Sequence, residues 1–391
     1  MNMLPASLSH VLTQKKSHDE VLHLRRHAIP TITDGIVAQQ DGVRYLSFCS
    51  NDYLGIATAL ASFPMRIPAY GAGASRLITG SHPAYVALEK ELADMKGTQA
   101  AWVFGNGYLA CIGVIPALMT KGDVILMDRL SHACMIDGCV LSGARFLRYD
   151  HNDMAHLELL LKTHRAKYRH CLLLTETVFS MDGDRAPLQE MAALAERHEC
   201  WLMSDDAHGF GLPAPIPNPA AIQMGTLSKA AGGYGGYVAG DQLLIDHFIT
   251  HARTSLFSTA LPQAVVDANM HGLHLMHTQP ERAERVMHHA VRLCGALGMP
   301  APQSAIIPII IGENEAVLKV QAALKTRGIL VSAIRSPSVP KGTARLRISL
   351  SAAHSKAHIE QLISGLQECL TKDIIFMQEA RRQSLATRDS D

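Results

Sequence analysis

The chain contains the stretch Trp201-Leu-Met-Ser-Asp-Asp-Ala-His-Gly-Phe-Gly and, a short way further on, the run Met224-Gly-Thr-Leu-Ser-Lys. Each begins with apolar residues typical of a buried strand and continues into polar residues. In an open parallel sheet, ligands bind beyond the carboxyl ends of the strands. The two stretches therefore predict an α/β fold in which one sheet edge carries Asp205, His208, Thr226 and Lys229.

These side chains suit the chemistry of pyridoxal phosphate (PLP). A lysine can form a Schiff base with the cofactor aldehyde, and a carboxylate can keep the pyridine nitrogen protonated so that the ring withdraws electrons. We assign these parts to Lys229 and Asp205, with His208 bonded to the ring oxygen and Thr226 to the phosphate. Taken singly, the lysine also fits a solvated loop, and Asp-Asp-Ala-His also fits a helix cap.

Composition narrows the class of protein. The 391 residues are enough for one large and one small domain, and 48% of them are hydrophobic. Lysine and arginine number 36 against 35 acidic residues, a balance that argues against a nucleic-acid-binding surface. No apolar stretch is long enough for a membrane span, and the first residues do not resemble a signal peptide.

Cysteine and histidine usage predicts a cytoplasmic protein without a metal site. None of the eight cysteines forms a C-x-x-C pair, which favours reduced thiols in the cytosol. Among the 21 histidines, His271, His274 and His277 follow helical spacing. We interpret them as a helix surface rather than as metal ligands.

Short apolar runs alternate with helical patterns between about residues 80 and 250. Strands are predicted at 124–127, 171–175, 201–203 and 237–239, with a helix at 187–198. This alternation predicts a mainly parallel central sheet with helices packed against it.

After about residue 280 the pattern restarts. Strands are predicted at 306–311, 329–331 and 346–350, with a helix at 315–327, which indicates a smaller C-terminal α+β domain. The predicted division of the chain is an N-terminal segment (1–45), a large PLP-binding domain (46–280), a small domain (281–377) and a polar tail (378–391).

Three further polar groups lie close to predicted strands or helices. Asn106-Gly107-Tyr108 comes before an apolar helical pattern, and such a helix start suits a phosphate because its N–H groups and dipole favour an anion. His132 is placed to stack on the pyridine ring and move protons, and the polar residues from Glu176 to Asp184 suit a site edge. Simpler interpretations are a helix-start turn, a loop histidine and an ordinary Asp-Gly turn.

Two arginines on the last predicted strand are candidates for holding a substrate carboxylate in a bidentate pair. We expect strand alternation to give this role to only one of Arg345 and Arg347, the other lying on the sheet surface. Nucleotide binding is not predicted. Arg76 occupies the third glycine position of a dinucleotide fingerprint, and Lys229 lacks the preceding glycine of a P-loop.

Together, these segments resemble the α-oxoamine synthases, a branch of the fold-type I PLP enzymes, over about residues 47–354. The matching segments are Ser50-Asn-Asp-Tyr-Leu-Gly55, His132, Phe179-Ser-Met-Asp-Gly-Asp184, Asp205-Asp-Ala-His-Gly209, Thr226-x-x-Lys229 and Val339-Pro-Lys-Gly-Thr-Ala-Arg-Leu-Arg347. The resemblance implies a PLP-dependent transferase with a large domain, a smaller C-terminal domain and a homodimer whose sites lie at the interface.

The resemblance also assigns individual residues. It implies that Ser180 contacts the cofactor and that Ser258 and Thr259 reach the cofactor phosphate of the partner subunit. Arg347 matches the carboxylate clamp of the family. The resemblance places two further substrate contacts at Asn51 and Arg26.

Within the family, residues 333–347 are most like the branch that acts in biotin biosynthesis. This implies a decarboxylating condensation of L-alanine with a pimeloyl thioester, carried by coenzyme A or by a carrier protein. The chain departs from the family pattern in short loops at 56–69 and 212–219 and in Asn106, where a serine is common. These departures border the acyl-donor side.

Two other functions remain open from the sequence. One is a related synthase that uses glycine or serine with a different acyl thioester. The other is a non-catalytic PLP-fold subunit with a binding or regulatory role. The intact set Lys229, Asp205, His132 and Arg347 argues against the second.

Overall fold

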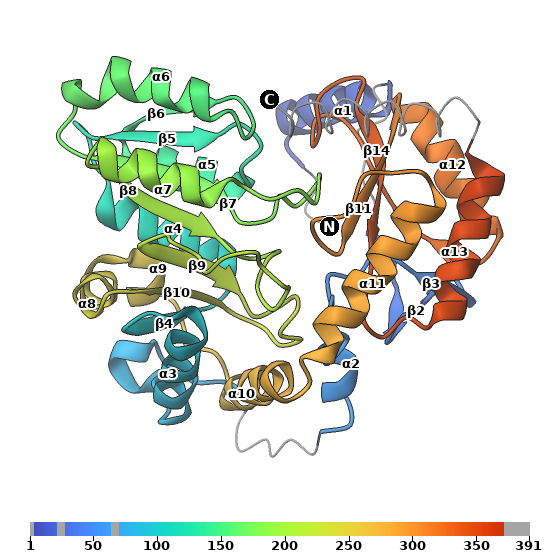
Figure 1. The fold of residues 1–391 in the computed structure, drawn as a ribbon, viewed down its shortest axis with the longest axis horizontal. Helices are drawn as coiled ribbons and strands as arrows, with labels where there is room; N and C mark the ends of the chain where they lie inside the picture. The colour runs from blue at the N-terminus through green and yellow to red at the C-terminus, as the bar shows by residue number, and fades with distance from the viewer. Residues whose placement is uncertain (1–3, 22–27, 64–69, 371–391) are drawn as a thin grey trace.

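The computed structural model describes residues 4–21, 28–63 and 70–370. Figure 1 shows a large sheet on one side of the molecule and smaller sheets on the other. The large sheet has seven strands in the order β4-β10-β9-β8-β7-β5-β6. They are β4 (Ala100–Phe104), β5 (Val124–Asp128), β6 (Arg145–Tyr149), β7 (Cys171–Glu176), β8 (Trp201–Asp205), β9 (Ile222–Thr226) and β10 (Gly236–Gly240). Within this sheet β10 runs antiparallel to both of its neighbours, β4 and β9, and the remaining pairs are parallel.

Helices cover both faces of the large sheet, which explains why its central strands read as unbroken apolar runs. Along β5, Ile125 and Met127 pack into one core cluster and Val124 and Leu126 into another. The first cluster includes residues of α4 (Gly107–Leu118), α5 (Ala133–Ser142) and α8 (Gln242–His251). The second includes residues of α6 (Met154–His164) and α7 (Leu188–Arg197).

The smaller sheets join the two ends of the described chain. One has the order β11-β14-β13, formed by Ile306–Gly312, Ala344–Ser349 and Ser332–Ile334. The other has the order β1-β2-β3-β12, formed by Ile32–Asp34, Val37–Gln40, Val43–Ser47 and Ile329–Leu330. In the second sheet β3 pairs with β12 in parallel, so N-terminal and C-terminal strands share one layer.

The remaining helices surround these sheets. Helix α10 (Gln263–Thr278) runs beside α3 (Ala84–Lys96) and α2 (Ile56–Leu60). It leads into α11 (Glu281–Ala296), which packs against α13 (Lys356–Cys369) on the side of the smaller sheets (Figure 1). Helix α13 in turn packs against α12 (Asn314–Thr326). Short turns are formed by Arg76–Gly80, Arg165–Lys167 and α9 (Arg253–Leu256).

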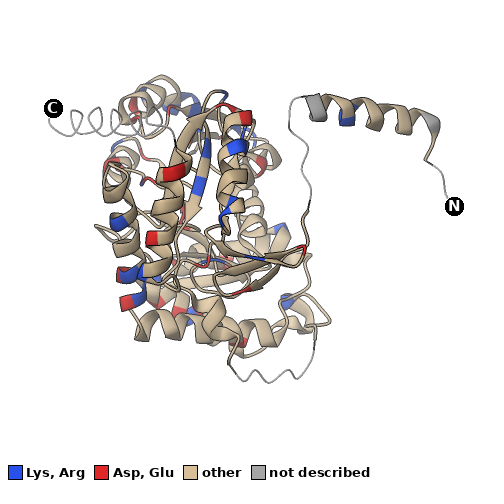
Figure 2. Ribbon diagram, turned by 90° about the vertical axis from the view of Figure 1, so that its right-hand side faces the viewer, with Lys and Arg blue, Asp and Glu red and all other residues tan. Residues whose placement is uncertain are grey.

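Figure 2 shows acidic and basic residues interspersed over the body of the molecule, while α1 (Ala6–Val21) projects away from it. No helix in the described part of the chain combines the length and the apolar character needed to cross a membrane.

The predicted fold class is confirmed: an α/β molecule with a mainly parallel central sheet and a smaller α+β part. The strands predicted from apolar runs lie within or next to β5, β7, β8, β10, β11, β12 and β14. The division of the chain at residues 45, 280 and 377 stays a prediction. The polar tail at 378–391 lies outside the described residues.

Candidate active site

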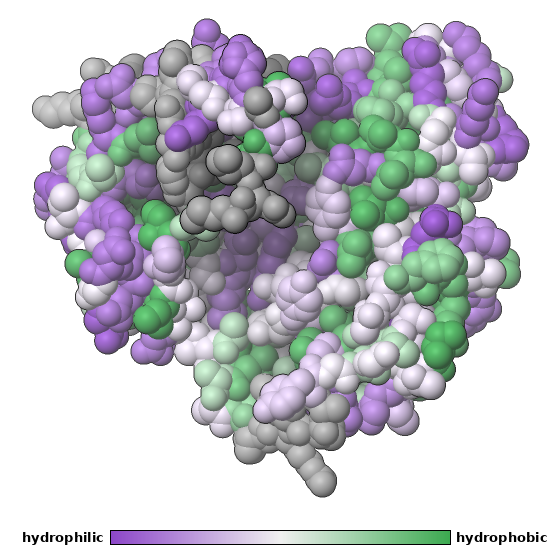
Figure 3. All heavy atoms as spheres, turned by 180° about the vertical axis from the view of Figure 1, so that it is seen from behind, coloured by the Kyte–Doolittle hydropathy of each residue, from purple (hydrophilic) through white to green (hydrophobic). Residues whose placement is uncertain are grey.

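A cavity of about 220 Å³ lies where β7, β8 and β9 end. Eight of the predicted site residues line it: Asn106, Gly107, Tyr108, His132, Asp205, His208, Thr226 and Lys229. The cavity therefore joins side chains from four strand ends or helix starts. Figure 3 shows the surface hollowed near the middle of one face, with hydrophilic residues in the hollow.

The carboxylate of Asp205 is one of two buried acids in the cavity. Asp205 is the last residue of β8 and is 5% exposed. Its Oδ1 accepts a hydrogen bond of 2.8 Å from the backbone N–H of Ala207. Burial raises the pKa of Asp205, and the positive charge of Lys229 opposes that rise. A positively charged partner in the cavity therefore favours the ionised acid.

The amine of Lys229 contacts an imidazole that is held neutral. Lys229 Nζ lies 2.7 Å from His208 Nε2. Burial lowers the pKa of Lys229, and burial together with the nearby Lys229 charge lowers the pKa of His208 well below its ordinary value. A neutral His208 accepts a hydrogen bond from Lys229 at Nε2, so the ring's own proton is assigned to Nδ1.

From His208 a hydrogen-bonded chain continues toward the small sheets. His208 Nδ1 lies 2.6 Å from the hydroxyl of Tyr53, and that hydroxyl donates to Asn51 Oδ1 over 3.2 Å. Arg347 donates from Nη2 to Tyr53, from Nη1 to Asn51 and from Nε to the carbonyl of Ser180, at 3.3, 3.1 and 2.5 Å. Asn51, Ser180 and Arg347 do not line the cavity. Asn51 and Arg347 connect to it through Tyr53, and Ser180 through its backbone N–H.

The expectation that alternation would separate Arg345 from Arg347 is wrong. Residues two apart on a strand point to the same face, and both arginines are buried. Their partners distinguish them, because Arg345 pairs with Asp182 and donates to the Thr343 carbonyl over 3.0 Å. Arg347 is the arginine that reaches the residues bonded to His208.

A helix start and two hydroxyls form the opposite end of the cavity. Asn106 caps α4 by accepting the Leu109 N–H at 2.8 Å, a role that an amide fills as well as a serine does. Thr226 Oγ1 lies 2.8 Å from Ser228 Oγ. A Cβ at Gly107 would lie 3.4 Å from Thr226 Cβ, so the helix start and the hydroxyls lie side by side. This combination fits a phosphate.

His132 caps the start of α5 and contacts a thiol that the sequence analysis missed. Its Nδ1 lies 2.9 Å from the Sγ of Cys134, which also lines the cavity. This contact raises the pKa of His132 to about 9, although burial opposes the rise. The available signal was the His-x-Cys spacing at a predicted helix start.

Glu176 is a second cavity residue that was named only as part of a polar cluster. It ends β7 and is the register partner of Asp205 on β8. Its Oε2 accepts the Ser180 N–H at 3.2 Å, while Oε1 is buried without a hydrogen-bond partner. The signal was an acid directly after an apolar strand, the same pattern that identified Asp205.

Two further predicted residues, Ser258 and Thr259, lie away from the cavity. Thr259 forms an isolated bridge with Ser75. The neighbouring Phe257 is 72% exposed. Arg26 lies outside the described residues.

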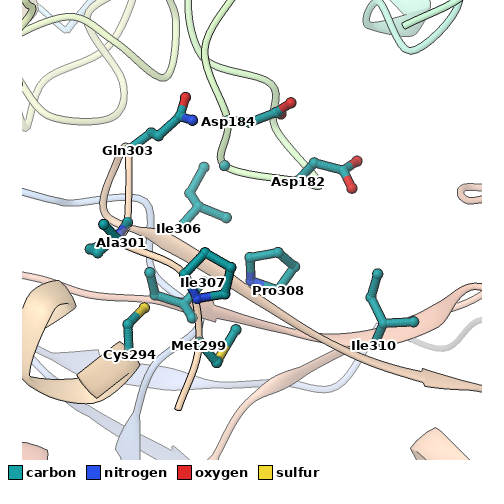
Figure 4. Close-up of a pocket in the computed structure, with 13 residues that line it drawn as sticks. Asp182, Asp184, Cys294, Met299, Ala301, Gln303, Ile306, Ile307, Pro308 and Ile310 are labelled. Carbon is teal, nitrogen blue, oxygen red and sulfur yellow. The ribbon is translucent and has the colours of Figure 1, made fainter. Parts of the chain in front are cut away.

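A second cavity, of about 210 Å³, lies between the loop after β7 and the strand β11 (Figure 4). Its walls are mostly apolar, and Asp182 and Asp184 lie on one side. Both acids already have charged partners, Arg345 and His151. Of the residues singled out from the sequence, only Asp182, Gly183 and Asp184 of the polar cluster at 176–184 line this cavity.

The first cavity fits PLP. It combines an amine, a buried carboxylate, a neutral imidazole and a phosphate-type helix start, which are the groups that this cofactor needs around its aldehyde, ring nitrogen, ring oxygen and phosphate. The fold and the site together define a PLP-dependent transferase of fold type I.

Comparison with known proteins specifies the family. Residues 43–366 match the family model described as aminotransferase class I and II. An 8-amino-7-oxononanoate synthase from Methylobacterium nodulans is 49% identical over 351 residues, covering 88% of this chain and 92% of the relative. Another, from Maricaulis maris, is 44% identical over 388 residues, covering 95% and 98%. The chain therefore belongs to the class I and II aminotransferase family, on the branch of the 8-amino-7-oxononanoate synthases.

Solved structures agree with this placement. A serine palmitoyltransferase from Sphingomonas wittichii is 27% identical with a TM-score of 0.83, covering 94% of this chain and 98% of the other. A serine palmitoyltransferase from S. paucimobilis with bound PLP is 26% identical with a TM-score of 0.82 and the same coverage.

Proposed function

We propose that the protein condenses L-alanine with a pimeloyl thioester, with loss of carbon dioxide, to form 8-amino-7-oxononanoate. The observation that carries the proposal is identity of 44–49% to synthases of that product over most of the chain. The geometry supports it, because Lys229 and Asp205 lie in the same buried cavity. The free state of all eight cysteines supports a cytoplasmic location.

When bound, PLP supplies an aldehyde for amine exchange and a ring that withdraws electrons from the amino-acid Cα. Lys229 is proposed to hold the aldehyde carbon, Asp205 the ring nitrogen and His208 the ring oxygen. The start of α4 and Thr226 would hold the phosphate, and His132 would stack on the ring. Each of these residues lines the cavity.

The amine of Lys229 is proposed as the base that takes the alanine Cα proton. A base works best when its pKa lies near the working pH, and burial lowers the pKa of Lys229 from its high ordinary value. His208 Nε2, 2.7 Å away, accepts a hydrogen bond from the amine and fixes its direction. The acyl group joins the alanine Cα and the thiol leaves the thioester. The alanine carboxylate then leaves as carbon dioxide, and Lys229 Nζ can return a proton to the same carbon.

Identification of the product tests this function. Purified protein with PLP is incubated with alanine, glycine or serine and with pimeloyl or longer acyl thioesters, each on coenzyme A or on carrier protein. We expect alanine with a pimeloyl thioester to give 8-amino-7-oxononanoate by mass. A strong preference for glycine or serine would contradict the substrate assignment while keeping the reaction class. No product with any pair would favour a non-catalytic subunit.

Replacing Arg347 with alanine is expected to weaken alanine binding at least about tenfold. Arg347 is proposed to hold the alanine carboxylate, and loss of one partner of a buried charged pair costs about 2–5 kcal/mol. The measurement is the alanine concentration dependence of the cofactor absorbance. Arg345→Ala is the control, since Arg345 is equally buried but already pairs with Asp182. Equal weakening in both variants would remove the special role of Arg347.

The protein is proposed to act as a homodimer in which Ser258 and Thr259 contribute to the partner's phosphate site. The position of Thr259 outside its own cavity supports this. Exchange of subunits between Lys229→Ala and Thr259→Val proteins should then regain about a quarter of wild-type activity. Half of the random dimers are mixed, and each mixed dimer has one undamaged site.

The control for this mixing experiment is subunit exchange verified by native mass spectrometry. If exchange is complete and activity stays at the level of the parents, each site is built within one chain. Thr259 would then have only the structural role shown by its bridge to Ser75.

A further inference from the structure

Two buried carboxyl groups lie side by side at the end of the large sheet. Glu176 ends β7 and Asp205 ends β8, and they are register partners in a parallel pair. Neighbouring strands are about 4.8 Å apart, and partners point to the same face. Glu176 is 2% exposed and Asp205 is 5% exposed, and both line the cavity of Lys229. Two like charges this close in a buried site do not both stay ionised.

The hydrogen bonds show which of the two acids is the better anion. Asp205 Oδ1 accepts the Ala207 N–H at 2.8 Å, and Lys229 supplies a positive charge. Glu176 Oε2 has the longer bond to Ser180 N, and Oε1 is buried without a partner. An ionised carboxylate with an unpaired buried oxygen carries a large desolvation penalty. The proton therefore belongs on Glu176.

The charged and titratable groups facing Glu176 come from several elements. Asp205 on β8 and Cys134 on α5 disfavour its ionisation, whereas His132 before α5 and Lys229 after β9 favour it. Burial is the largest influence, followed by Asp205, and together they raise the pKa of Glu176 to about 8. The two nearby cations therefore do not reverse the effect of burial and the like charge.

We propose that Glu176 is a positioning residue that keeps its proton at neutral pH and so leaves Asp205 as the single anion beside the cofactor nitrogen. The proposal deepens the proposed function and rests on the role given there to Asp205. A neutral Glu176 also protects the base, because an ionised Glu176 would raise the pKa of Lys229 and reduce the fraction of free amine.

A first test uses the pH dependence of thermal stability. A carboxyl whose pKa is raised on folding, from 4.5 to about 8, destabilises the folded wild-type protein progressively as pH rises between those values. Glu176→Gln keeps the shape without the titration. We expect the Tm advantage of this variant over wild type to grow from pH 4.5 to pH 8 and then to level off. A gap that is constant or shrinks over this range would overturn the proposal.

A second test detects the protonated carboxyl group of Glu176 directly. The infrared spectrum of the holoenzyme at pH 7 should contain a carbonyl band of a protonated carboxylic acid. Glutamate labelled with ¹³C should shift this band, Glu176→Gln should remove it, and raising the pH through about 8 should remove it in wild type. A band that shifts with labelled aspartate instead would assign the proton to Asp205 and overturn the proposal. This label test needs only wild-type protein.

A third comparison separates positioning from simple packing. Glu176→Gln should retain at least about tenfold more activity than Glu176→Ala, because a neutral group that accepts the Ser180 N–H is kept. The pH–kcat profile of Glu176→Gln should also lack the change near pH 8. Failure of the product assay would leave the stability and infrared results unaffected, so failure of the function and failure of this inference are distinguishable.

Discussion

Replacing Lys229 with alanine is expected to lower kcat by at least about 10³-fold, since a positioned general base contributes about 10²–10⁴-fold and the variant also loses the cofactor attachment. The measurement combines initial rates with borohydride reduction and peptide mapping. In wild type, the reduced cofactor should be found on the peptide containing Lys229. Lys229 is the lysine that lies 2.7 Å from His208 in the cavity.

The control for this variant is Lys90→Ala. Lys90 is exposed and pairs with Asp94 on the surface of α3, so its removal should leave the rate unchanged. Recovery of the reduced cofactor on a lysine other than Lys229 would contradict the assignment of the base.

Replacing Asp205 with asparagine is expected to be the second most damaging change. A neutral amide has no charge with which to keep the ring nitrogen protonated, and loss of a buried charged partner costs about 2–5 kcal/mol, or roughly 30-fold to several thousand-fold in rate. PLP should still bind through Lys229 and the phosphate groups. The measurement is kcat with saturating PLP, together with the cofactor content of the purified variant.

Asp206→Asn is the matched control, because the neighbouring acid is also buried but serves another purpose. Asp206 pairs with Lys96 at 2.5 Å and accepts the Thr177 hydroxyl at 2.6 Å. Its loss should lower Tm, because Lys96 would remain buried without its partner. The folded fraction should retain cofactor chemistry. If Asp206→Asn were the variant with low kcat and Asp205→Asn nearly normal, the Asp-x-x-His assignment would be wrong by one residue.

The central sheet was predictable wherever burial on both faces leaves only apolar residues. All residues of β5 and β7 are buried, and their apolar runs end at an acid at the functional edge. Two of the missed strands do not follow this rule. Edge strand β6 contains two exposed arginines, and β9 contains glutamine and glycine within a fully buried strand. Pairing with neighbours, rather than local composition, makes these segments strands.

The candidate site was predictable where residue type and spacing already indicated chemistry, as at Lys229 and Asp205. Contacts between distant segments were not. Tyr53 joins His208 to Arg347 across 155 and 294 positions, respectively. Glu176 acquires its importance from the register of β7 with β8, which the sequence of either strand alone does not contain. Arg345 is distinguished from Arg347 by its partners, among them Asp182, which lies far away in the sequence.

The pairing of β3 with β12 constrains how the chain folds during its synthesis on the ribosome. Leu46 and Ile329 are partners in one sheet, so the strand made early must wait for one made late. At a synthesis rate of about 5–20 residues per second, the delay is roughly 15–60 s. During that time β3 has an uncovered edge, and such edges template association between chains. Nascent chains that stop before Ile329 should therefore depend on chaperones to stay dispersed, whereas full-length chains close this edge themselves.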